Sequence, residues 1–218
     1  MIFCAALLGG SFDPVHHGHV ALAELFASML HPDELRIMPA GQPWQKKAGL
    51  EASDADRVAM LKLAFEDAAF NPVIDLREIE RDTPTYTVET LRELRAELGP
   101  DASIVFLMGA DQLQKLDSWR DWTSLFELTN FGIAARPGYR LDAAALPPAV
   151  ARELAQRLAT PEEVRASKAG RMCLAHTLAV DISATEVRAA LRAGAKNVNA
   201  LLAPQVLDYI QQHNLYKS

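Results

Sequence analysis

The chain has 218 residues, of which 50% are hydrophobic and 23% are charged, and its formal net charge is −6. A chain of this length can bury a sizeable core as one α/β unit. The acidic balance argues against a protein that coats nucleic acid, and no stretch reaches the ~18 apolar residues of a membrane span. The composition therefore predicts a soluble protein with neither nucleic-acid nor membrane partners.

The two cysteines bear on the cellular compartment. Cys4 and Cys173 both lie in apolar runs, without the spacing of a CxxC metal or redox motif. They fit a reduced core better than a disulfide. Residues 1–8 carry no basic segment before their apolar run, so they predict a strand and not a signal peptide. We expect a cytoplasmic protein.

Short apolar runs alternate with helical patterns along the whole chain. The apolar runs predict strands at residues 2–8, 35–39, 73–79, 104–108, 131–135 and 172–180. The helical patterns fall at residues 18–30, 53–69, 87–98, 149–158, 184–193 and 204–213. Strands separated by helices predict a parallel sheet with right-handed crossovers. We expect one domain over residues 1–218, with a C-terminal helical part from about 184 to 218.

In such sheets, ligands bind outside the carboxyl ends of the strands. The loops after Leu8, Met38, Met108, Ala135 and Val180 should therefore share one crevice. Met29, Met60 and the leucine stripes of the helices are expected in the core.

The first of these loops, residues 9–19, reads GGSFDPVHHGH. Its glycines permit a tight turn and a close approach of the backbone to an anion. The helix that follows offers free N–H groups and the positive end of its dipole. His16 and His19 are three residues apart, so both imidazoles lie on one side and can donate to phosphate oxygens. Gly18 leaves that approach open.

Two other interpretations of this loop compete with phosphate binding. The histidines could ligate a metal, but His16 and His17 are adjacent and point apart, and no nearby cysteine completes a zinc set. The loop could also be a glycine-rich turn with solvated histidines. It lacks the GxGxxG fingerprint, so a dehydrogenase is not supported.

A second motif, ISATEVR at residues 182–188, follows a predicted strand and opens a helix. Ser183 can cap that helix and offer its hydroxyl to a phosphate. Arg188, just over one turn later, could bind the same anion with its guanidinium fork. Alone, the segment is also compatible with an ordinary helix start. After a C-terminal strand it forms a second phosphate cradle opposite the first.

The HxGH of residues 16–19 and the ISxTxxR of residues 182–188 together resemble the adenylyl- and cytidylyltransferase superfamily. Further segments are similar to bacterial nicotinate-nucleotide adenylyltransferases along nearly the whole chain: RDTPTYTVETL at 81–91, GAD at 109–111 with Trp119, RPG at 136–138, and the 206–216 segment. The resemblance implies a Rossmann-like, doubly wound parallel sheet with helices on both faces. It also implies transfer of the adenylyl group of ATP to nicotinate mononucleotide, with Mg²⁺, in NAD biosynthesis.

The resemblance also implies roles for individual residues. It assigns catalysis to His16, His19 and Arg188, with no metal held by protein side chains. It assigns ATP to Gly9, Gly10, Ser11, Phe12, His16, His19, Gly109, Asp111, Ile182, Ser183 and Arg188. It assigns the acceptor to Lys46, Tyr86, Thr87, Asp111, Trp119 and Arg136.

Three of these residues also have plainer interpretations. Trp119 can stack on a pyridinium ring, or it can belong to the core. Thr87 opens a helix whose N–H groups suit a carboxylate, or it is an N-cap. Asp111 can hold ribose hydroxyls or orient Mg²⁺, or it can cap a helix.

The sequence departs from the family pattern at two places. Gln45 stands where the family often has a histidine, although Lys46 keeps a cation there, and Ala184 replaces a common second serine. Alternatives remain: a pantetheine-phosphate adenylyltransferase, an enzyme preferring nicotinamide mononucleotide, and a non-catalytic nucleotide-sensing module. A homo-oligomer is compatible with the sequence.

Overall fold

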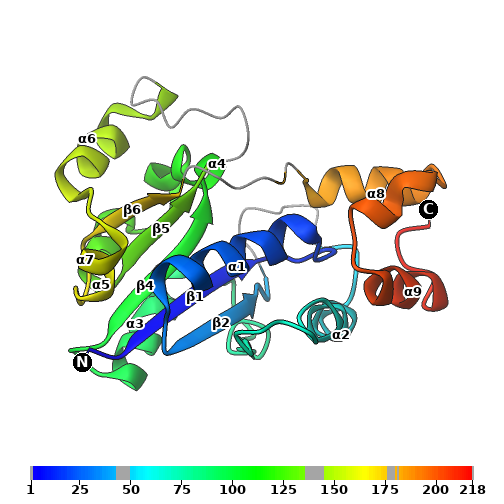
Figure 1. Cartoon of the computed structure of the whole chain (residues 1–218), viewed down its shortest axis with the longest axis horizontal. Coiled ribbons are helices and arrows are strands. Elements are labelled where there is room, and N and C mark those ends of the chain that lie inside the picture. Colours follow the sequence, from blue (N-terminus) through cyan, green and yellow to red (C-terminus); the bar gives the residue numbers. More distant parts are fainter. Residues whose placement is uncertain (1, 43–49, 136–144, 176–179, 181, 218) are drawn as a thin grey trace.

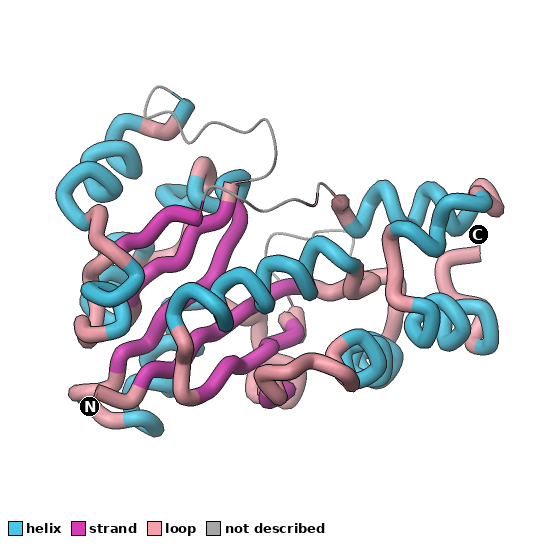
Figure 2. Tube along the Cα trace, viewed as in Figure 1, coloured by secondary structure: helices cyan, strands magenta, loops and turns pink. Residues whose placement is uncertain are grey.

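The computed structural model describes residues 2–42, 50–135, 145–175, 180 and 182–217. Its strands form one six-stranded sheet, seen as the arrows in Figure 1 and in magenta in Figure 2. Their bounds are β1 (Cys4–Gly10), β2 (Glu34–Pro39), β3 (Val73–Ile74), β4 (Ser103–Gly109), β5 (Asn130–Ala134) and β6 (Met172–Ala175).

The strand order is β3-β2-β1-β4-β5-β6, and every neighbouring pair is parallel. Leu8 of the central strand β1 lies opposite Ile37 of β2 and Leu107 of β4. The order reverses between β1 and β4, which is the switch point where such sheets bind ligands. The predicted Rossmann-like, doubly wound sheet is confirmed.

Helices pack on both faces of this sheet. The longer ones are α1 (His17–Leu30), α2 (Asp54–Ala64), α3 (Thr87–Leu98), α6 (Pro148–Arg157), α8 (Ala184–Arg192) and α9 (Pro204–Gln212). The short ones are α4 (Ala110–Leu113), α5 (Leu125–Leu128) and α7 (Pro161–Arg165), with 3₁₀ turns at Leu116–Ser118, Trp122–Ser124 and Lys196–Ala200. Helix α1 packs on one face through Leu22 and Phe26, and α3 packs on the other through Val88 and Leu91.

The two apolar cores have different extents. The core under α1 and α2 continues past the sheet to α8 and α9, which lie at the opposite end of the molecule from the N-terminus in Figure 1. Met60 is fully buried there, and Met29 is partly buried against it. Cys4 and Cys173 are buried free thiols. No described helix is long and apolar enough to cross a membrane.

Several predicted bounds were wrong. The helix predicted to reach residue 69 ends at Ala64, and the strand predicted over 73–79 has only two residues. Asn71 has a positive φ of 42°, so the chain turns sharply just before β3. The strand predicted over 172–180 ends at Ala175, residues 176–179 lie outside the described ranges, and Val180 is not in a strand.

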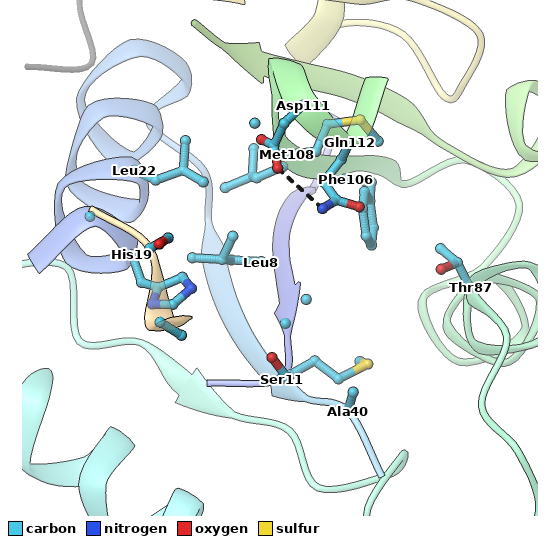
Figure 3. A pocket seen from close by; sticks show the side chains of 18 of the residues that line it. Leu8, Ser11, His19, Leu22, Ala40, Thr87, Phe106, Met108, Asp111 and Gln112 are labelled. Carbon is cyan, nitrogen blue, oxygen red and sulfur yellow. Dashed lines mark hydrogen bonds between the residues drawn. The ribbon is translucent and has the colours of Figure 1, made fainter. Parts of the chain in front are cut away.

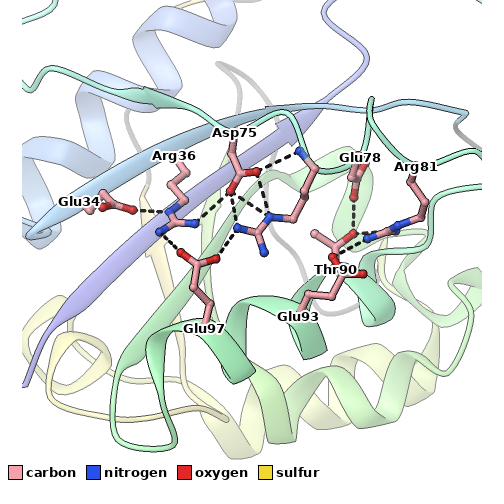
Figure 4. A network of polar contacts seen from close by, with 9 residues as sticks. Glu34, Arg36, Asp75, Glu78, Arg81, Thr90, Glu93 and Glu97 are labelled. Carbon is pink, nitrogen blue, oxygen red and sulfur yellow. Dashed lines mark hydrogen bonds and ion pairs between the residues drawn. The ribbon is translucent and has the colours of Figure 1, made fainter.

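A charged network attaches the short edge strand β3 to its neighbours (Figure 4). The guanidinium of Arg36, on β2, donates to Asp75 over 3.0 Å and to Glu97 of α3 over 2.7 Å. Arg77 also donates to both carboxylates. Ion pairs therefore replace much of the strand pairing that a longer β3 would supply.

Candidate active site

A cavity of about 350 Å³ opens at the carboxyl ends of β1, β2 and β4 (Figure 3). Most of the predicted site residues line it: Gly9, Gly10, Ser11, His16, His19, Thr87, Gly109, Asp111, Trp119, Ile182 and Ser183. The loops after Leu8, Met38, Met108 and Val180 do share this crevice, whereas the loop after Ala135 lies outside the described residues. His19 and Thr87 lie on opposite sides of the cavity in Figure 3.

The two histidines of the first motif form a stacked pair. Their ring centroids are 3.7 Å apart, and the rings are inclined by 27°. The backbone N–H of His16 donates to Nδ1 of His19 over 3.3 Å. A neutral His19 ring therefore carries its proton on Nε2 and can donate from that atom. His17 does not line the cavity, as the spacing predicted.

Phe12 lies behind this pair and does not line the cavity. Its side chain is fully buried, and its ring meets the His19 ring edge-on at 4.8 Å. Its φ is 46°, a conformation that a bulky residue rarely adopts. Phe12 thus supports His19 from the core side. A Cβ on Gly18 would lie 3.0 Å from Nδ1 of His16, so that glycine leaves room for the imidazole.

The second motif begins α8 as predicted. Ser183 is the N-cap, and its hydroxyl accepts from the backbone N–H of Glu186 over 3.2 Å. Ile182 and Ser183 line the cavity, but Arg188 does not. The Arg188 guanidinium donates to the carbonyl of Asp13 over 2.6 Å and pairs with Glu51.

The end of β4 brings a carboxylate to the cavity. Asp111 lies in the first turn of α4, whose N-cap residue is Gly109. A Cβ on Gly109 would lie only 2.5 Å from Oδ1 of Asp111. Position 109 must therefore be glycine for Asp111 to keep this orientation.

The opposite wall is built around the start of α3 and Trp119. Tyr86 is the N-cap residue, and Thr87 is the first helical residue and lines the cavity. The helical hydrogen bonds begin at the N–H of Glu89, so the amides of Thr87 and Val88 precede them. Trp119 packs edge-on against Phe106 at 5.9 Å, with the rings inclined by 88°. Its indole Nε1 is buried without a hydrogen-bond partner among the described residues.

Tyr86, which was predicted to bind the acceptor, is not part of this wall. Its ring lies under the guanidinium of Arg120, 4.5 Å from the ring centroid, and it does not line the cavity.

Comparisons with known proteins agree with this geometry. A family model described as cytidylyltransferase-like matches residues 7–190. A probable nicotinate-nucleotide adenylyltransferase of Herminiimonas arsenicoxydans is 55% identical over 215 residues, which cover 99% of this chain and 97% of that protein. A relative with the same name from Chromobacterium violaceum is 46% identical and covers 97% of each chain.

The chain belongs to the nicotinate-nucleotide adenylyltransferase family. Solved structures of other proteins have the same fold as this chain. The nicotinic acid mononucleotide adenylyltransferase of Plasmodium falciparum, complexed with NaAD, aligns with a TM-score of 0.75 at 20% identity, covering 98% of this chain and 97% of that one. A putative nicotinate-nucleotide adenylyltransferase of Vibrio parahaemolyticus aligns with a TM-score of 0.64 at 16% identity, covering 100% and 97%.

Several residues that line the cavity of this adenylyltransferase were not predicted from the sequence. Glu78 lines the cavity and accepts a hydrogen bond from the Thr90 hydroxyl over 2.7 Å. Burial raises the pKa of Glu78, although the hydrogen bond from Thr90 and the charge of Arg81 act in the opposite direction. Glu78 belongs to the charged run 77–81, which indicates a solvated surface, so no local signal marked it. Other unpredicted lining residues are Ala40, Thr85, Thr90, Phe106 and Gln112.

Lys46 and Arg136, the two predicted cations of the acceptor side, lie outside the described residues. Within the described ranges, no group of three or more His, Cys, Asp or Glu side chains is placed to hold a metal ion.

Proposed function

We propose that this chain transfers the adenylyl group of ATP to nicotinate mononucleotide, producing deamido-NAD and pyrophosphate. The observation that carries the proposal is the cavity itself. The two motifs predicted to bind phosphate line one side of it, next to each other and not opposite as predicted, since a Cβ on Gly18 would lie 3.4 Å from the Ile182 carbonyl. A helix start and an indole line the other side. Two nucleotides can therefore meet within one cavity.

The reaction needs an oxygen of the acceptor phosphate to attack the α-phosphorus of ATP in line, with pyrophosphate leaving. Such chemistry depends on positioning and charge neutralisation, and it requires no protein nucleophile. In this proposal, Nε2 of His19 and the ring of His16 donate to phosphate oxygens, as does the helix start at Ser183. Arg188 donates to a phosphate oxygen once the nucleotide is bound.

Mg²⁺ enters the proposal together with ATP. Mg²⁺ usually keeps several waters and uses one or two carboxylates plus substrate phosphates, and Asp111 is a carboxylate lining the described cavity. The residues present fit an ion that the triphosphate would carry, with Asp111 as the side chain that would help to hold it. The ion would supply neutralisation of the phosphate charge.

Selectivity for nicotinate belongs to the start of α3. The amides near Thr87 and the positive end of the helix dipole favour a carboxylate. A nicotinamide group would place its own NH₂ donors against these amide donors, so that both lack an acceptor. Each unpaired group costs about 1–3 kcal/mol of binding free energy. Two such mismatches amount to roughly 10²-fold in kcat/KM. Trp119 stacks on both rings alike, so it does not contribute to this discrimination.

The test is pyrophosphate release with ATP and Mg²⁺ across three acceptors: nicotinate mononucleotide, nicotinamide mononucleotide and phosphopantetheine. We expect nicotinate mononucleotide to be preferred by roughly 10²-fold over its amide and activity to stop with EDTA. Trp119→Ala should weaken both pyridine acceptors by similar factors and preserve their ratio. Equal activity with phosphopantetheine would refute the acceptor assignment. A wild-type ratio near one would refute the carboxylate site.

We further propose that the chain acts in the cytoplasm as one domain over residues 1–218. The buried free thiols of Cys4 and Cys173 support a reducing compartment. The core that continues from α1 to α9 supports one domain.

A further inference from the structure

Arg188 shares a carboxylate with a second arginine on its own helix. Nε of Arg188 lies 2.7 Å from Oε1 of Glu51, while Arg192 pairs with Oε2 of the same side chain. The two arginines are four residues apart on α8, so both face the same way. Glu51 thus forms ion pairs with the predicted phosphate ligand and with its neighbour.

The backbone at Glu51 is fixed independently of its side chain. Its N–H donates to Oδ2 of Asp13 over 2.9 Å, and the next N–H, that of Ala52, donates to Oδ1 over 3.0 Å. Asp13 is buried in the loop that carries His16 and leads into α1. The Glu51 side chain is therefore held beside Arg188, and a substitution of that side chain keeps these backbone bonds.

This arrangement bears on ATP binding. The Arg188 side chain is 15% exposed and points toward Asp13 and Glu51, whereas Ser183 at the start of the same helix lines the cavity. A triphosphate bound at Ser183 would compete with Glu51 for the guanidinium. It would also be repelled by the Glu51 charge, because like charges at close range disfavour each other.

We propose that Glu51 sets the ATP affinity of this enzyme by competing with the triphosphate for Arg188. Arg192 keeps the Glu51 carboxylate paired when Arg188 moves to the nucleotide. The inference rests on the proposed function, since it takes ATP as the ligand. It adds two residues, Glu51 and Arg192, that the family motifs do not include.

The test measures the Kd of ATP with Mg²⁺ by calorimetry, without an acceptor. Glu51→Gln should tighten ATP binding roughly fivefold, which is the range of a partly exposed ion pair. Arg192→Gln should weaken it about two- to threefold, because Glu51 then binds Arg188 alone. In the Glu51→Gln background, Arg192→Gln should have no further effect.

The matched control is Glu127→Gln, which removes the same charge from an exposed position on α5, at the far end of the molecule from α8 (Figure 1). Its ATP affinity should equal that of the wild type. Thermal unfolding of each variant verifies that the fold is intact.

Each of the other outcomes would overturn a different part of the proposal. Unchanged or weaker ATP binding in Glu51→Gln would overturn the competition. An Arg192→Gln effect of equal size in both backgrounds would indicate a long-range charge effect and overturn the role of Arg192. Absence of ATP binding by the wild type would overturn the proposed function itself. ATP binding without product from nicotinate mononucleotide would overturn only the acceptor.

Discussion

His19 illustrates how much a single residue position decides. The turn before α1 positions its ring. The ring also stacks on that of His16 and meets the ring of Phe12 edge-on. The bond from the His16 amide to Nδ1 leaves Nε2 as the donor. His17, which lies between the two stacked histidines in the sequence, starts α1 with its N–H bonded to the Leu201 carbonyl, and its side chain does not line the cavity.

We therefore predict that His19→Ala lowers kcat/KM for adenylyl transfer by at least ~10²-fold, the usual effect of removing a charge-stabilising donor. His17→Ala should be much milder. Steady-state kinetics of both variants, with circular dichroism to verify the fold, measure the difference. Equal losses in the two variants would show that the loop geometry does not distinguish the histidines.

Single residues were predictable where a backbone rule applied. Ser183 as N-cap and His16 beside His19 follow from spacing alone. The orientation of Arg188 toward Glu51 and the exposure of Glu78 to the cavity were not predictable. Both depend on which charged side chains tertiary packing brings together, and the sequence carries no periodic signal for that.

At the scale of elements, β3 shows where periodicity fails. Residues 73–79 were predicted as a full strand, yet only Val73 and Ile74 pair with β2. Beyond them, Asp75 and Arg77 join ion pairs. Long strands and helices with strong apolar patterns were predicted well. Helix α7 was missed, although Thr160 and Glu163 form a capping box and Pro161 is the first helical residue, both of which mark a helix start.

The β3 attachment predicts a pH dependence of stability. Burial alone would raise the pKa of Asp75, but hydrogen bonds from Arg77 and Arg36 and the charge of Arg77 lower it overall. The pKa of Glu97 is lowered by hydrogen bonds from Arg36 and Arg77. Both carboxylates thus stabilise the fold above their unfolded pKa of about 4, and this contribution is lost as the pH falls through the folded values.

Asp75→Asn should lower the free energy of unfolding near neutral pH by about 2–3 kcal/mol, because it leaves two arginines underpaired. The difference from the wild type should shrink near pH 3, below the unfolded pKa of about 4, because the unfolded carboxyl then binds protons more readily than the folded one. Urea unfolding at both pH values measures this. Asp101→Asn is the control, since its ion pair with Lys168 is exposed and little change is expected. A difference independent of pH would contradict the assignment.

At the scale of the whole molecule, the segment after α9 is hydrogen-bonded to the loop after β1. The hydroxyl of Tyr216 donates to Oδ1 of Asp13 over 2.8 Å. The amides of Glu51 and Ala52 also donate to Asp13, so three donors from the described residues meet at this buried carboxylate. One carboxylate joins the loop after β1, the segment before α2 and the segment after α9.

Tyr216→Phe should destabilise the fold by about 1.5–2.5 kcal/mol, the effect of removing one bond to a buried charge. It should also raise the KM for ATP, because Asp13 helps to position the loop of His16. Tyr209→Phe is the matched control. Its hydroxyl donates to Asp56 of α2, away from the loop, over 3.0 Å. That variant should leave the KM unchanged, and equal KM values in both variants would contradict a role for Tyr216 in positioning.

The bond between Tyr216 and Asp13 spans 203 positions of the chain. On a ribosome, the loop with its paired histidines emerges early and remains without this third donor until synthesis has passed residue 216. A nascent chain can pair β1 with β2 and β4 well before that point, so the sheet can form while the site is incomplete. Likewise, a protease cut between α9 and Tyr216 would leave the cavity-lining residues in place and remove the contact that secures their first loop.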